Sequence, residues 1–253
     1  MRLDSFLVSN NFYKSRTKAV EGINRGEVLV NGKPCLKRAT EINDSDEVKL
    51  QQAEKPFVSV GGDKLKRALE KISIEILGKV FIDVGASTGG FTDCLLRKGA
   101  KHVYCVDVGE NLLDPTIAVD NRVTVMDKTN ARYLQINQFD GPVDGIVVDC
   151  SFISLEYILP PLVDLLKNEG FILALIRPQF ELKERVKLKN GILRNTEQRN
   201  KILKTLYDFS FHLNLFPQAI VSVTIDKNKN SEYIFYISKQ PPKIEFDRII
   251  IWK

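Results

Sequence analysis

Residues 83–91 have the sequence DVGASTGGF, which ends one apolar strand and begins a helix. Gly85 allows the chain to turn tightly, and Gly89-Gly90 let a ligand approach the start of the helix. Around this loop, short apolar runs separated by helical stretches occur at residues 80–84, 103–108, 123–126, 145–149 and 171–176. This alternation predicts a doubly wound, mostly parallel α/β sheet, whose ligands bind beyond the carboxyl ends of the strands.

The spacing of the loop glycines is not that of a dinucleotide-binding turn. The order G-x-G-x-x-G is absent, and Asp107 closes the second strand about twenty residues after Gly85. A carboxylate there can accept hydrogen bonds from two ribose hydroxyls, while the loop faces a group less negative than a pyrophosphate. Asp107 alone could be a turn former, but the joint pattern favours S-adenosylmethionine over NAD as the cofactor.

Positive charge is concentrated at the start of the chain. The net charge is +5, from 37 basic and 32 acidic side chains. Residues 1–38 carry this whole excess, because three acids there face eight basic residues: Arg2, Lys14, Arg16, Lys18, Arg25, Lys33, Lys37 and Arg38. A basic face on a small separate module suits a phosphate backbone. A solvated helix face explains the charge equally well until the pattern within the segment is considered.

That pattern predicts two short helices. An apolar helical face begins at residues 6–8 and is broken by Asn10-Asn11. Ser15 can cap a second helix, which runs to about Asn24.

A small sheet is expected to follow, with strands at residues 28–30 and 47–50 and a tight hairpin turn at Asn31-Gly32. The string R-L-D-x-x-L-V … S-R-x-x-A … I-x-x-G-x-V-x-V-N-G-K, at residues 2–33, resembles the S4 RNA-binding domain. The resemblance implies an α+β module over residues 1–56, with a linker at about 51–58. Its expected RNA-binding residues are Arg2, Lys14, Arg16, Lys18, Arg25, Lys33 and Lys37.

Further motifs continue the pattern of the loop: T-N-A-R-Y-L at 129–134, V-V-D-C-S-F-I-S-L at 147–155 and R-P-Q-F-E at 177–181. Together they resemble the TlyA-type family, S4-domain ribose 2′-O-methyltransferases of ribosomal RNA that are related to FtsJ and historically labelled haemolysins. The resemblance implies a Rossmann-like class I methyltransferase domain over residues 59–253, which methylates a cytidine with S-adenosylmethionine. Its implied cofactor contacts are Asp83, Gly85, Ala86, Ser87, Thr88, Gly89, Gly90, Phe91, Asp107, Asn130 and Asp149.

A ribose hydroxyl is a poor acid, so its methylation needs cations near the oxygen and carboxylates that orient them. The related enzymes use a Lys-Asp-Lys-Glu tetrad. Carried over by motif, its positions are Lys64, Asp149, Arg177 and Glu232. Lys64 lies in the string S-V-G-G-D-K-L at residues 59–65, and without that motif it would pass for a surface lysine. An unpaired carboxylate at the end of a buried strand is costly, which favours a functional role for Asp149.

Arg177 departs from the tetrad, since the family has lysine at this position. An arginine cannot accept a proton at ordinary pH. Three options follow: Lys64 or water removes the proton, Arg177 only stabilises the oxyanion and catalysis is slower, or the protein binds cofactor and RNA but methylates poorly.

Other departures lie near the predicted site. Val60 replaces a family arginine, residues 226–231 lack the usual glycines and proline, and residues 109–115 replace a stretch that contains tyrosine and glutamine. A second basic cluster lies at residues 183–204, where an RNA-gripping loop and a solvated face are both open: Lys183, Arg185, Lys187, Lys189, Arg194, Arg199, Lys201 and Lys204.

The composition predicts no metal site and no disulfide scaffold, because the four cysteines show no C-x-x-C spacing and there are two histidines. The N-terminus is unlike a signal peptide, and the longest apolar run, 171–176, is far too short to span a bilayer. We therefore expect a cytoplasmic rRNA methyltransferase that needs no membrane. The alternatives are a ribosome assembly factor with weak or lost activity and, less favoured, a pore-forming haemolysin.

Overall fold

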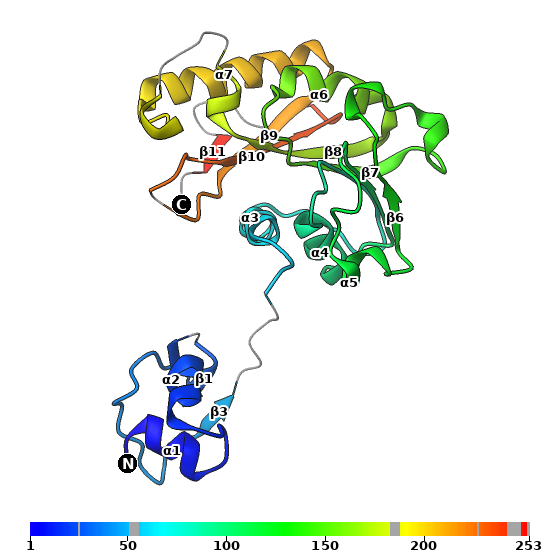
Figure 1. The fold of residues 1–253 in the computed structure, drawn as a ribbon. Helices are drawn as coiled ribbons and strands as arrows, with labels where there is room; N and C mark the ends of the chain where they lie inside the picture. Colours follow the sequence, from blue (N-terminus) through cyan, green and yellow to red (C-terminus); the bar gives the residue numbers. More distant parts are fainter. Residues whose placement is uncertain (25, 51–55, 183–187, 227, 242–248, 252–253) are drawn as a thin grey trace. The chain divides into compact units, whose positions relative to one another are not determined.

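The computed structural model spans residues 1–253 and describes all of them except 25, 51–55, 183–187, 227, 242–248 and 252–253 (Figure 1). The chain separates into two compact units, Met1–Pro56 and Phe57–Lys253. Arg25, most of the expected linker and three members of the second basic cluster (Lys183, Arg185 and Lys187) lie outside the described residues.

The first unit contains two helices and a three-stranded antiparallel sheet with the order β2-β1-β3. The elements are α1 (Leu3–Ser9), α2 (Arg16–Asn24), β1 (Val28–Val30), β2 (Lys33–Pro34) and β3 (Val48–Leu50). Both predicted helices are confirmed. The first ends at Asn10, before Asn11 turns into the left-handed region at φ 60°, and the Ser15 hydroxyl accepts the Lys18 amide at 3.3 Å as a cap.

The predicted hairpin turn is also confirmed. Asn31 and Gly32 have φ 52° and 76°, as a type I′ turn requires, and they join Val30 to its partner Lys33. The faces of the helices and sheet that pack together are apolar, and the buried core consists of Leu3, Leu7, Ala19, Ile23, Val28 and Ile42.

In the second unit the described strands form one sheet with the order β11-β9-β10-β8-β7-β4-β5-β6. Their bounds are β4 (Val80–Val84), β5 (His102–Val106), β6 (Val123–Met126), β7 (Val143–Val148), β8 (Leu166–Ile176), β9 (Phe216–Ser222), β10 (Tyr233–Ser238) and β11 (Ile250–Ile251). Strands β4 to β8 pair with one another in parallel, whereas β10 is antiparallel to β8 and β9. The predicted doubly wound, mostly parallel fold is thereby confirmed.

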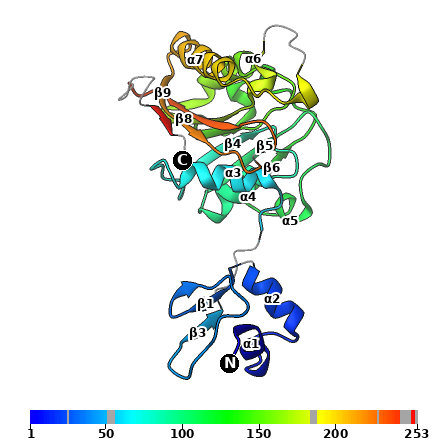
Figure 2. The same ribbon diagram turned by 90° about the vertical axis from the view of Figure 1, so that its left-hand side faces the viewer.

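Helices cover both faces of this sheet (Figure 2). They are α3 (Val60–Leu69), α4 (Gly90–Arg97) and α5 (Pro115–Ala118) on one face, and α6 (Leu155–Leu162) and α7 (Thr196–His212) on the other. Short 3-10 turns are η1 (Ala131–Tyr133), η2 (Ile136–Gln138), η3 (Val163–Leu165), η4 (Pro178–Phe180) and η5 (Lys189–Gly191). Successive strand residues serve opposite faces, so Phe81 packs with Leu65 and Leu95, while Ile82 packs in the core that holds Leu159 and Leu203.

Strand register determines which residues meet at the carboxyl edge of the sheet. Val84 pairs with Val148, so the glycine-rich loop after β4 lies beside the end of β7. The antiparallel strand β10 starts where β8 ends, because Tyr233 pairs with Ile176. Segments before β10 and after β4, β7 and β8 therefore converge at one edge.

Candidate active site

The glycine-rich loop adopts a conformation that its sequence permits. Gly85 has φ 80°, and a Cβ there would lie 2.5 Å from the Asp149 carbonyl oxygen. Asp107 fixes the loop from the neighbouring strand, since its carboxylate accepts the amides of Ser87 and Gly109, each at 2.8 Å. The carboxylate of Asp107 and the loop therefore form one rigid unit.

Helix α3 begins directly against the start of α4. A Cβ on Gly90 would lie 2.1 Å from the Ser59 hydroxyl and 2.9 Å from the Gly62 amide nitrogen. The second glycine of the Gly89-Gly90 pair therefore serves the contact between the two helices. This close approach brings Lys64, on the second turn of α3, over the edge of the sheet.

A cavity of about 340 Å³ opens between the loop and α3. It collects most of the residues that the sequence assigned to cofactor binding and three of the four tetrad positions. Its lining includes Lys64, Asp83, Gly85, Ala86, Ser87, Thr88, Gly90, Phe91, Asp149 and Arg177. Gly89, Asp107 and Asn130 do not line it. Asp107 acts on the loop as described, and the side chain of Asn130 accepts the Arg132 amide at the start of η1.

The four tetrad positions form one ion-pair cluster. Lys64 Nζ lies 2.9 and 2.8 Å from Oε1 and Oε2 of Glu232. Arg177 pairs through Nη2 with Asp149 and donates from Nη1 to the Ser151 hydroxyl at 2.7 Å. The Nε atom of Arg177 lies 3.6 Å from Glu232 Oε1, which joins the two pairs. All four side chains are largely shielded from solvent, at 12 to 21% exposed.

Register explains this convergence of residues far apart in sequence. Asp149 and Arg177 are the first residues after β7 and β8, and Glu232 immediately precedes β10. Helix α3 is tied to the segment that precedes β10, because Arg67 in the helix and Lys71 just after it donate to the carbonyl oxygens of Thr224 and Ser222. The helix therefore holds its lysine in a fixed position relative to the sheet.

Two carboxyl groups at the cavity have raised pKa values. Burial is the main cause of the raised pKa of Asp149, and the charges of Arg177 and Lys64 oppose it. Burial also raises the pKa of Asp83 to about 7. Its Oδ2 accepts from the Thr92 amide and hydroxyl at 3.0 and 2.6 Å, but its buried Oδ1 has no hydrogen-bond partner among the described residues.

A second cavity, of about 560 Å³, lies nearby. Lys64 and Val60 line both cavities, so Lys64 borders the two. The second cavity is also lined by Gln179, Asn190, Ile192, Thr224, Ile225, Asp226, Lys229, Asn230 and Glu232. The segment that lacks the family glycines thus forms part of its wall.

Phe152 is a feature of this edge that the sequence did not reveal. It follows Asp149 by three residues, has φ 64° and leaves 89% of its surface exposed. Its ring lies 4.8 Å from that of Phe180, and both line a hollow of about 680 Å³ with Arg132 and Tyr157. A bulky residue in the left-handed region is strained, and an exposed phenylalanine gains nothing from burial. Neither property is visible before the fold is known.

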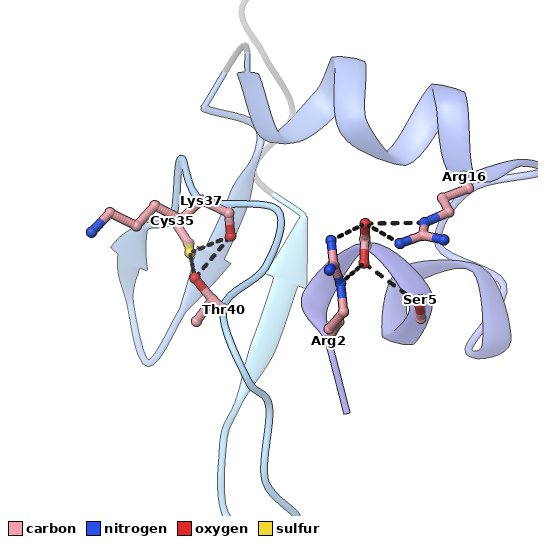
Figure 3. A network of polar contacts seen from close by, with 7 residues as sticks. Arg2, Ser5, Arg16, Cys35, Lys37 and Thr40 are labelled. Atoms are coloured by element: carbon pink, nitrogen blue, oxygen red, sulfur yellow. Dashed lines mark hydrogen bonds and ion pairs between the residues drawn. The ribbon is translucent and has the colours of Figure 1, made fainter.

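In the first unit, the six described candidates for RNA binding are all exposed: Arg2, Lys14, Arg16, Lys18, Lys33 and Lys37. Figure 3 shows the guanidinium groups of Arg2 and Arg16 on opposite sides of one carboxylate, which belongs to Asp4. Lys18 pairs with Glu21 at 2.8 Å. The Lys37 carbonyl accepts the Thr40 hydroxyl at 2.8 Å, which fixes the loop that carries this lysine (Figure 3).

The sheet order and the glycine loop at the end of β4 define the class as a Rossmann-like methyltransferase with an added small α+β module. The model of the FtsJ-like methyltransferases matches residues 57–240, and that of the S4 domain matches residues 1–48. The chain belongs to the FtsJ-like methyltransferase family and carries an S4 domain. The resemblance inferred from the motifs is thereby confirmed.

Curated relatives and a solved structure are similar to this chain over most of their length. The 16S/23S rRNA (cytidine-2′-O)-methyltransferase TlyA of Mycobacterium tuberculosis is 42% identical over 182 residues, which cover 72% of this chain and 68% of TlyA. Hemolysin A of Brachyspira hyodysenteriae is 41% identical and covers 80% of this chain and 85% of its own. A solved structure from Streptococcus thermophilus, described as a hemolysin, has a TM-score of 0.70 at 35% identity and covers 96% of this chain and 90% of that one.

Proposed function

We propose that this protein transfers a methyl group from S-adenosylmethionine to the 2′-hydroxyl of a cytidine in ribosomal RNA. The observation that carries the proposal is the cluster of Lys64, Asp149, Arg177 and Glu232 at a cavity beside the glycine-rich loop. The rRNA substrate and the cytidine are taken from relatives such as TlyA. A protein with this substrate would work in the cytoplasm, among the ribosomes.

The residues at the first cavity fit S-adenosylmethionine, which when bound supplies an electrophilic methyl group. The unpartnered Oδ1 of Asp83 offers an acceptor to the cofactor's ammonium group, and an ammonium there would favour the ionised form of this carboxyl. Residues 85–88 of the glycine loop line this cavity, so a ligand bound there would lie against the loop. Asp107 lies outside the lining of this cavity, and each of its oxygens, which already accepts one amide, keeps a further acceptor site suited to a ribose hydroxyl.

The tetrad would act on the ribose oxygen through its two cations. Lys64 and Arg177 place positive charge at the cavity, which stabilises the developing oxyanion. Asp149 and Glu232 orient these cations through the ion pairs described above. Since Arg177 cannot accept a proton, Lys64 is the tetrad cation able to do so, in its neutral form.

Three features support an RNA substrate. The second cavity shares Lys64 with the first but includes no residue of the glycine loop, so a target nucleoside there would reach the shared lysine. The exposed ring of Phe152 offers a flat face on which an unpaired base can stack. The S4 domain match and its exposed basic residues support binding to structured RNA.

Methyl transfer can be tested with isolated 30S and 50S subunits and S-adenosylmethionine carrying a labelled methyl group. After digestion of the RNA to nucleosides, we expect the label in 2′-O-methylcytidine. The Lys64→Ala variant serves as the control and should leave the RNA unlabelled. Label on a base, or none with a folded wild-type protein that binds the cofactor, would contradict the proposal.

A second function, an RNA-binding assembly factor with weak methyl transfer, is favoured by one observation. Arg177 stands at the family lysine position, and its guanidinium already contacts Asp149 and Ser151. Tight subunit binding without label would support this function. For the haemolysin alternative, helices long and apolar enough to cross a bilayer are absent from the described residues.

A further inference from the structure

Asp4 is a buried carboxylate in the first unit that the proposed function leaves without a role. It lies in the first turn of α1 and is 1% exposed. Burying a carboxylate is costly unless it is paired and hydrogen-bonded. Two arginines supply these bonds, one at the N-terminal end of each helix of this unit.

The contacts are specific in geometry. Arg2 donates from Nε to Oδ1 at 3.2 Å and from Nη2 to Oδ2 at 3.1 Å. Arg16 donates from Nε and Nη2 to Oδ2 at 3.0 and 2.8 Å. Each guanidinium thus uses one edge for Asp4, and three of its five N–H bonds remain for another acceptor. Among the described residues, neither guanidinium has a second carboxylate.

The backbone that carries both arginines is fixed. The Arg2 carbonyl accepts hydrogen bonds from the amides of Ser5 and Phe6. The backbone of Arg2 also forms an isolated antiparallel β-bridge with that of Glu41. Arg16 is the first residue of α2, directly after the capping Ser15. The two helices pack through the shared core of this unit. The fixed backbone therefore brings both guanidinium groups to one carboxylate. The side chains of Arg2 and Arg16 nevertheless remain 46% and 59% exposed, respectively.

We propose that Asp4 is a positioning residue that aligns Arg2 and Arg16 as a clamp for the phosphates of an RNA backbone. Two guanidinium groups beside one carboxylate carry a net charge of +1, and their unused donors match phosphate oxygens in forked geometry. The two arginines would repel each other without Asp4, and each would lose a fixed orientation. The neighbouring Arg contacts hold the pKa of Asp4 down at about 2, so the carboxylate stays ionised at neutral pH.

This clamp rests on the proposed function, because it assumes an RNA substrate. Its test is the affinity of full-length Asp4→Asn protein for purified 50S and 30S subunits, measured over a range of salt concentrations. The substitution removes one negative charge, so the net charge of the unit rises by one. A purely electrostatic contribution therefore predicts tighter binding, whereas the clamp predicts binding weaker by about tenfold and a salt dependence reduced by about 1 to 2 in log–log slope.

A matched control is Asp44→Asn, which makes the same charge change at an exposed position of the same unit. We expect this variant to bind as tightly as the wild type or more tightly. Equal affinity of the Asp4→Asn and Asp44→Asn proteins would overturn the clamp. Loss of cytidine methylation in the wild type, with the expected order of affinities preserved, would instead overturn the proposed methyl transfer.

Asp4→Asn protein could fail to fold, which its thermal unfolding would reveal. The Arg16→Lys variant covers that case, because it keeps the charge and alters an exposed side chain. It replaces the fork by a point charge that can still pair with Asp4, and we expect binding about fivefold to tenfold weaker in a protein that still unfolds cooperatively. Wild-type affinity for this folded variant would overturn the clamp as well.

Discussion

Among the tetrad positions, Arg177 departs from the residue found in the family. Its contacts show which interactions a lysine at this position would lose. Its Nη atoms reach Asp149 and Ser151, and its Nε faces Glu232 at 3.6 Å. The Nε–H itself has no hydrogen-bond partner among the described residues, so the guanidinium donates to two acceptors from one plane, which the single nitrogen of a lysine cannot do. The arginine therefore binds the ends of β7 and β8 together at the centre of the cluster.

We expect the Arg177→Lys variant to methylate no faster than the wild type, and about tenfold slower if the Ser151 contact orients Asp149. The Lys64→Arg variant should be nearly inactive but still bind cofactor and RNA, because it removes the tetrad group able to accept a proton. Single-turnover methylation of ribosomal subunits measures both rates. A faster Arg177→Lys enzyme, or an active Lys64→Arg enzyme, would refute this division of roles.

Asp83 gives the protein without cofactor a predictable pH dependence. Its pKa is about 7 in the folded state and near 3.8 when unfolded, so the folded state retains its proton over this range. The contribution of Asp83 to stability is present below about pH 4 and is lost as the pH rises through about 7. In thermal unfolding between pH 4.5 and 8, the wild type should therefore lose stability relative to the Asp83→Asn variant. A constant difference across this range would contradict the raised pKa.

Phe152 predicts a separation of stability from activity. In the Phe152→Gly variant, relief of the left-handed strain offsets the lost contact with Phe180, so the free energy of unfolding should change by less than about 1 kcal/mol. Methylation should fall by about tenfold or more, since the ring is expected to stack on a base. Denaturant unfolding and single-turnover methylation measure the two effects. Full activity in this variant would remove Phe152 from RNA recognition.

Among the elements, helix α3 depends on its close contact with the start of α4. Substitutions at two glycines, Gly90 and Gly61, are expected to affect this contact differently. A Cβ on Gly90 would collide with Ser59 and Gly62, whereas a Cβ on Gly61 would meet atoms no closer than 3.3 Å. We expect Gly90→Ala to destabilise the second unit by about 2 kcal/mol and to impair methylation, because α3 and its lysine must shift. Gly61→Ala is the matched control and should be nearly neutral. Similar unfolding and activity of both variants would show that α3 is not seated on this contact.

The regular elements could be predicted from sequence where their pattern is local. Asn31-Gly32 marks a turn by itself, and the apolar runs of β4 and β6 coincide with their strands. Strand β8 begins at Leu166, five residues before its predicted start, because Leu166 pairs with Val143 of β7 ahead of a register shift, after which Phe171 pairs with Gly145. The pairing of β10 with β8 depends on contacts distant in sequence, and no local pattern reports it.

Local sequence patterns predict less of the candidate site than of the regular elements. Lys64 lies among Lys66 and Arg67, and a motif was needed to single it out. In the folded chain, Lys64 forms an ion pair with Glu232, which lies 168 positions away in the sequence, and no local motif reports this contact. Asp4 and Phe152 were missed for the same reason, since burial of a carboxylate and exposure of a ring are properties of packing.

For the whole molecule, the division into two compact units predicts that each survives separation. Each unit has its own buried core, and deletion of residues 1–56 removes none of the residues that line the first cavity. We expect the truncated protein to unfold cooperatively and to bind S-adenosylmethionine as the full chain does. Its affinity for ribosomal subunits should fall by at least about tenfold, because the loss of each phosphate contact weakens binding. Calorimetry and subunit binding at fixed salt provide the measurements. Undiminished methylation at low subunit concentration would show that the first unit is not the docking device.

The place of β10 in the sheet has a consequence for the order in which a nascent chain matures. Among the described strands, β9 reaches β8 only by way of β10, although β9 is synthesised first. Glu232, the last tetrad member in sequence, emerges together with β10. A growing chain therefore presents its N-terminal arginines long before its four charged groups can meet. During translation, affinity for RNA would come first, and chemical competence would come only after β10 has emerged.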